Sequence, residues 1–89
     1  MTLSLADVLS ARRAIAGVAV RTPLVPSAFM SRFAGQDFLL KLETTQPIGA
    51  FKLRGAVNAL SALGLGVAGV TCCSTGNHGR GVALSLIHI

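Results

Sequence analysis

The chain has 89 residues, of which 52% are hydrophobic, 12% charged and 4% aromatic. This composition excludes an intrinsically disordered polypeptide, and the length excludes more than one ordinary domain. Eight basic and three acidic residues give a net charge of +5, but the bases are scattered and no Trp or Tyr accompanies them, which argues against a nucleic-acid partner.

The N-terminal residues have the pattern of a helix. Ser4 and Asp7 are typical of a helix start, because a hydroxyl can accept a free backbone N–H bond and an acid suits the positive first turn. Helical spacing of apolar residues continues to about Ala16, and Gly17 is suited to end the helix.

The next segments are short and separated by turn residues. Two prolines predict an extended connection over residues 22–25. We expect a short helix over residues 27–33, closed by Gly35. The apolar run 37–43 lies between polar loops and predicts a strand.

The second half continues the alternation of helices and strands. Apolar positions predict a helix over residues 51–63, and the uncharged run 69–73 predicts a buried strand. A polar turn, 74–79, follows, and the last ten residues begin another helix. This order predicts an α/β fold with a parallel layer, whose ligands lie beyond the carboxyl ends of the strands.

Two polar loops, residues 41–52 and 74–79, would share that edge of the sheet. The second loop, with small residues and two glycines, suits binding of an anion such as a carboxylate by backbone N–H groups. The Asn77 amide can donate to an oxygen on a ring. Lys52 opens a helix, where the helix dipole disfavours a positive charge, so its amine is a candidate nucleophile toward an aldehyde.

Each of these residues also has a structural interpretation when taken alone. A lysine in a first helical turn is usually solvated, and Phe51 is typical of a core. Asn77 and His78 are typical helix-capping or hydrogen-bonded structural residues. Their joint arrangement is what favours a site.

Two segments carry a family resemblance. They are residues 46–56, Gln-Pro-Ile-Gly-Ala-Phe-Lys-Leu-Arg-Gly-Ala, and the turn 74–79, Ser-Thr-Gly-Asn-His-Gly. Both resemble the N-terminal signature of the threonine and serine dehydratases. These dehydratases are fold-type II (tryptophan synthase beta-like) pyridoxal-phosphate enzymes. Residues 21–24 and 40–43 resemble the segments that precede this signature, so four segments match in register and the likeness is specific.

The resemblance implies a role for each matched residue. Lys52 would be the catalytic lysine that forms the internal aldimine with pyridoxal 5'-phosphate, and Phe51 would lie against one face of the pyridine ring. Asn77 would bind the ring hydroxyl. The substrate carboxylate would be held by one loop, formed by Ser74, Thr75, Gly76, Asn77 and His78.

The implied reaction is loss of water and ammonia from a small hydroxy amino acid to give a 2-oxo acid, with Lys52 taking the Cα proton. Thr75 stands where serine racemases have a serine, which disfavours racemisation, and Ala50 replaces a common serine. An amino-acid racemase or a threonine synthase-like enzyme stays open as an alternative. The wording of residues 74–80 and of 4–8 is closest to the hydroxyectoine-utilisation dehydratases.

The resemblance also implies a domain organisation. Residues 1–83 would be the N-terminal part of a catalytic domain. Residues 84–89, Leu-Ser-Leu-Ile-His-Ile, depart from the family pattern and suggest a non-native or truncated tail. The family's glycine-rich phosphate loop would come later in a longer chain. We therefore expect the 89 residues alone to be inactive, and the full-length protein to be a homo-oligomer.

Cys72 and Cys73 are adjacent and poorly placed to bond to each other. We expect buried free thiols, which fit a reducing, cytoplasmic location, and no metal site. Two non-enzyme alternatives remain: a small basic binding module, and a membrane span over the uncharged residues 55–79. Asn58 and the polar residues near 77 argue against the membrane span.

Overall fold

A computed structural model describes residues 2–64 and 66–88. Three residues lie outside the described ones: Met1, Leu65 and Ile89. Met1 and Ile89 are the outer ends of the two predicted domain segments, and Leu65 falls within the possible membrane span. The elements follow in the order α1, β1, α2, β2, a 3-10 turn, α3 and α4. The molecule measures 52 × 31 × 25 Å and has a radius of gyration of 15.8 Å, against about 12 Å for a compact domain of this length.

The predicted first helix is confirmed as α1, Leu5–Ile15. The Ser4 hydroxyl accepts from the Asp7 N–H at 3.2 Å, and the Asp7 carboxylate accepts from the Ser4 N–H at 2.8 Å. The Ser4 hydroxyl also donates to the Asp7 carboxylate at 2.8 Å, and this bond, aided by the one from the Ser4 N–H, holds the pKa of the exposed Asp7 carboxyl below its usual value. Gly17 has the predicted positive φ, 85°.

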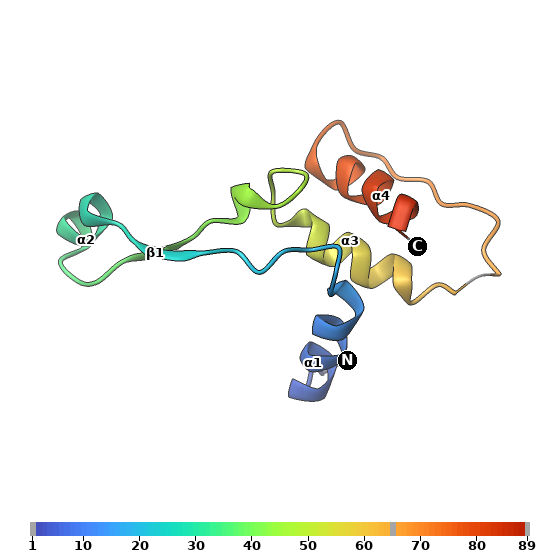
Figure 1. The fold of residues 1–89 in the computed structure, drawn as a ribbon, viewed down its shortest axis with the longest axis horizontal. Helices are drawn as coiled ribbons and strands as arrows, with labels where there is room; N and C mark the ends of the chain where they lie inside the picture. The colour runs from blue at the N-terminus through green and yellow to red at the C-terminus, as the bar shows by residue number, and fades with distance from the viewer. Residues whose placement is uncertain (1, 65, 89) are drawn as a thin grey trace.

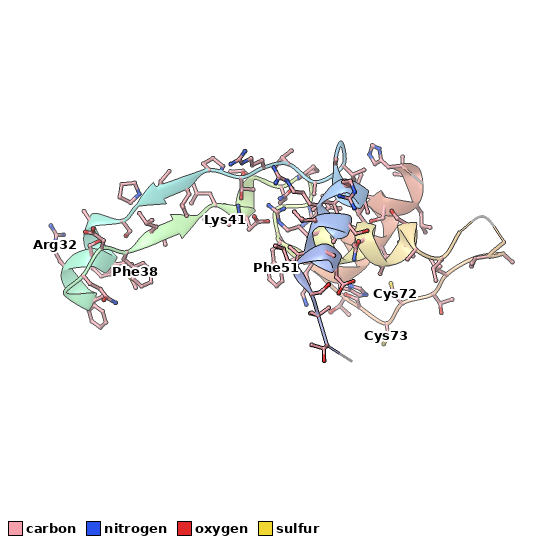
Figure 2. The ribbon with its side chains drawn as sticks, turned by 90° about the horizontal axis from the view of Figure 1, so that it is seen from below. Arg32, Phe38, Lys41, Phe51, Cys72 and Cys73 are labelled. Carbon is pink, nitrogen blue, oxygen red and sulfur yellow. The ribbon has the colours of Figure 1, made fainter. Side chains whose placement is uncertain are left out.

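An arm extends away from the helices (Figure 1). Its strands are β1, Leu24–Pro26, and β2, Leu39–Lys41, which pair antiparallel. The short helix α2, Ala28–Ala34, connects them and ends at Gly35 in the left-handed conformation, as predicted. Figure 2 shows Arg32 and Phe38 at the far end of the arm and Lys41 near the helices.

The core is centred on α3, Lys52–Ser61, which packs against α4, Asn77–His88, and against the end of α1. The buried hydrophobic side chains are few: Ile48, Leu53, Ala56 and Val57. Ser85 of α4 is fully buried, and its hydroxyl donates to the Gly81 carbonyl at 2.6 Å. Both predicted helices are present with shifted bounds: α3 ends two residues before the expected Leu63, and α4 begins at Asn77, within the predicted turn 74–79.

The predicted parallel layer is wrong for the described residues, whose only sheet is the antiparallel β1–β2 pair. The predicted strand 69–73 is wrong too: these residues form no strand, and Cys72 and Cys73 are exposed free thiols rather than buried ones. A central strand needs hydrogen-bonding partners along its edges. The strands of the described residues, β1 and β2, pair with each other in the arm and offer residues 69–73 no partner. The segment therefore runs back along α4 as extended, unpaired chain (Figures 1 and 2).

Among the described residues, no helix combines the length and the apolar character needed to cross a bilayer.

Candidate active site

Lys52 is the first residue of α3, and its side chain is exposed. Its Nζ lies 5.3 Å from the centroid of the Phe51 ring, within the range of a cation–π interaction. The Phe51 ring is itself 58% exposed, so it is not a core residue. An amine and an aromatic face are thus presented together at the start of a helix.

The loop before Lys52 is fixed by its own turn and by the core. Gly49 has a φ of 76°, which a residue with a side chain rarely adopts, and its N–H donates to the Gln46 carbonyl at 2.7 Å. Ile48 is buried in the core. The conformation of the backbone that leads into Lys52 is therefore set by residues of this chain.

Glu43 and Arg54 close the same loop with a two-point ion pair. Arg54 Nη2 donates to Glu43 Oε1 at 2.7 Å, and Arg54 Nε donates to Glu43 Oε2 at 3.0 Å. The Thr22 hydroxyl and the Gln46 amide also donate to Glu43, at 2.7 and 3.0 Å. The hydrogen bonds from Arg54, aided by those from Thr22 and Gln46 and opposed by burial, lower the pKa of Glu43 to about 2.

Gln46 joins this cluster to the segment that follows α1. Its side chain is 3% exposed, accepts from the Val20 N–H and donates to the Val20 carbonyl, both at 2.9 Å. A buried amide with all these partners is a costly group to remove. The sequence patterns predicted no site role for Glu43, Gln46 or Arg54. A detectable signal exists, since Glu43 is the only acidic residue after position 37.

The second loop is held mainly by one hydroxyl. Ser74 Oγ accepts from the N–H groups of Gly76 and Gly79, at 3.2 and 3.1 Å. Helix α4 then begins at Asn77, and no acceptor is found within the described residues for the N–H groups of Asn77 and His78. Helix N-termini of this kind attract anions. The predicted loop residues are all exposed: Ser74, Thr75, Gly76, Asn77 and His78.

The two loops lie at the same end of the helix pair, because α3 and α4 run side by side in the same direction (Figure 1). Gly81 allows the close approach. A Cβ at position 81 would lie 3.3 Å from Ala56 Cβ and 3.5 Å from the Lys52 carbonyl oxygen. Gly81 follows Asn77 by four residues, about 6 Å along a helix. The starts of both helices, Lys52 and Asn77, are thereby brought to one end of the helix pair, the end nearer the arm (Figure 1).

These groups fit the ring end of an aldehyde-bearing cofactor. The amine of Lys52 can react with an aldehyde, the Phe51 ring offers a face for stacking, and the amide of Asn77 offers a donor for a ring oxygen. The N–H groups at the start of α4 suit a carboxylate.

A family model described as pyridoxal-phosphate dependent enzyme matches residues 15–86. The L-threonine ammonia-lyase of Thermotoga maritima is 39% identical over 93% of this chain, and the catabolic L-threonine dehydratase of Escherichia coli is 37% identical over 96%. The biosynthetic L-threonine dehydratase of Mycobacterium bovis is 44% identical over 92%. The chain spans only 21, 26 and 20% of these relatives' lengths. No solved structure matches it at a significant level.

Proposed function

The chain belongs to the pyridoxal-phosphate dependent enzyme family, and from this premise we propose that it is the lysine-bearing N-terminal part of a threonine or serine ammonia-lyase. The observation that carries the proposal is the placement of Lys52 and the start of α4 at one end of a packed helix pair. The similarity to three relatives named as L-threonine ammonia-lyase or dehydratase supports the substrate class, a hydroxy amino acid.

The proposed roles follow from the chemistry of each group. Lys52 Nζ holds the cofactor and then takes the proton from the substrate Cα. Phe51 packs against the ring, and the Asn77 amide donates to the ring hydroxyl. Pyridoxal phosphate, when bound, supplies an electron sink for the charge left on Cα. The substrate carboxylate is bound by the second loop, Ser74, Thr75, Gly76, Asn77 and His78.

Further proposals concern the location, the oligomeric state and the subgroup of the full-length protein. A cytoplasmic location and a homo-oligomeric full-length protein are proposed by analogy with metabolic enzymes of this kind. The link to hydroxyectoine-utilisation dehydratases rests only on the wording of residues 4–8 and 74–80. A racemase or threonine synthase-like activity remains the alternative, and Thr75 is the residue that disfavours racemisation.

A chimera tests the activity. Residues 2–83 of this chain would replace the aligned segment of the E. coli threonine dehydratase, and formation of a 2-oxo acid from L-threonine would be measured. We expect activity that falls at least about 100-fold in Lys52→Ala, the order expected for loss of a general base. Lys41→Ala is the matched control and should retain activity. A folded chimera without activity, one unaffected by Lys52→Ala, or one that instead forms D-allothreonine, the product of inversion at Cα alone, would overturn the proposal.

The isolated chain has a separate expectation, because a cofactor held at one end only loses most of its contacts. We expect weak attachment of pyridoxal phosphate, detected by borohydride reduction and peptide mapping, and no turnover. Tight attachment that disappears in Lys52→Ala would show that the 89 residues suffice to bind the cofactor.

A further inference from the structure

A cleft of about 400 Å³ lies where the end of α1, the segment after it, β2 and α3 meet. This volume is within the range of small-molecule sites, about 300–1,000 Å³. Its apolar wall includes Ile15, Ala19 and Val20, and its charged groups are Arg12, Arg21, Lys41 and Arg54. Lys52 and the second loop do not line it, so this cleft is separate from the candidate active site.

Arg54 provides the cleft with donors that are already oriented. Its Nε and Nη2 groups are hydrogen-bonded to Glu43 and to the Val20 carbonyl. A guanidinium has five N–H donors, and no hydrogen bond from Nη1 is found within the described part of the chain. The ion pair with Glu43 fixes the plane of the guanidinium, so a ligand would not have to order this side chain.

The charges around the cleft are unbalanced. Glu43 is the only carboxylate that contacts a lining side chain among the described residues, and it serves both Arg54 and, at 3.7 Å, Lys41. Four lining cations against one carboxylate leave a charge of +3. The carbonyl end of α1 opposes part of this charge, but only with a partial negative charge.

We propose that this cleft binds a small phosphate-bearing molecule, either inorganic pyrophosphate or a phosphate ester with a compact apolar body. The doubly charged phosphate pairs with Arg12 and Arg21 and accepts from Arg54 Nη1. The apolar wall accommodates the organic part of an ester. The inference is independent of the proposed function, because it uses none of the residues assigned to the reaction.

The test is an NMR titration of the ¹⁵N-labelled 89-residue chain at low salt with inorganic pyrophosphate, inorganic phosphate and phenyl phosphate. We expect shifts at residues 12–21 and at the Arg54 side chain, and tighter binding of phenyl phosphate than of inorganic phosphate. Arg12→Ala and Arg21→Ala should each weaken binding by about tenfold, as expected for loss of a charge-assisted hydrogen bond. Both side chains are exposed, so folding is not at risk.

Arg13→Ala is the matched control, because Arg13 is the exposed neighbour of Arg12 on α1 and does not line the cleft. It should leave the affinity within about twofold, the small change expected for an exposed charge outside the contact. Equal weakening by Arg13→Ala would mean that net charge alone attracts the anion and would overturn the proposal. Shifts confined to the start of α4, or no shift at millimolar pyrophosphate, would overturn it as well.

Discussion

The two connections that lead into α3 and α4 are built in different ways. The first, residues 43–51, is closed by the Glu43–Arg54 ion pair and anchored by buried Gln46 and Ile48. The second, residues 66–76, is exposed over almost its whole length and is held at its end by the Ser74 hydroxyl. The difference shows that the lysine-bearing half of the candidate site is organised by contacts within these 89 residues.

The largest expected effect comes from the core beneath the first loop. Leu53 is fully buried, so Leu53→Ala should cost about 2–5 kcal/mol of unfolding free energy through lost burial and a cavity. Because the core is small, this should leave little cooperative unfolding in a urea titration followed by circular dichroism. Leu63→Ala, at a 51% exposed position, is the control and should change little. Equal effects of the two substitutions would contradict a core centred on α3.

The next largest effect comes from the ion pair. Glu43→Gln keeps a hydrogen-bonding side chain but removes the charge, and should cost about 2 kcal/mol, the order expected for charge-assisted hydrogen bonds. Thermal melting of the wild type and of Glu43→Gln at neutral pH measures this loss of stability. Asp37→Asn, at an exposed position in the arm, is the control and should be neutral within error.

The pH dependence sharpens the same comparison. Because the pKa of Glu43 is lowered to about 2 in the folded state from 4.5, its contribution is complete above about pH 5 and is lost as the pH falls toward 2. The wild-type melting temperature should therefore fall across this window more steeply than that of Glu43→Gln. Parallel curves for the two proteins would contradict the assigned role of Glu43.

The smallest effect on stability concerns the connection before α4, residues 66–76. Cys72 and Cys73 are exposed (Figure 2), so both should react with a thiol reagent in native buffer as fast as in urea. Ser substitutions at both positions should leave the melting temperature unchanged. Protection of either thiol in native buffer would restore the buried strand that the sequence predicted.

The sequence was sufficient for features that local residues determine. Local hydrogen bonds between Ser4 and Asp7 mark the start of α1. The backbone freedom of glycine marks the positions of positive φ that follow α1 and α2, at Gly17 and Gly35. The strand 69–73 depends instead on neighbouring strands, which composition cannot supply. An apolar run of Val and Cys is typical of a buried strand, yet within the described residues it has no partner.

The polar cluster was missed for a related reason. Glu43 and Arg54 are eleven residues apart, and Val20 and Gln46 twenty-six, so their contacts follow only from how α3 packs against the segment after α1. The assigned roles of Lys52, Phe51 and Asn77 stay predictions. The structure places Lys52 and Asn77 at one end of the helix pair, but their chemistry depends on the cofactor.

Hydrogen exchange followed by NMR tests most directly whether the connection before α3 is more ordered than the connection before α4. The Gly49 N–H, bonded to Gln46, and the Val20 N–H, bonded to the Gln46 side chain, should exchange much more slowly than the N–H groups of residues 70–73, which should exchange as in an unfolded peptide. Slow exchange at residues 70–73, or fast exchange at Gly49 and Val20, would contradict the conclusion that contacts within this chain order the lysine-bearing loop more than residues 70–73.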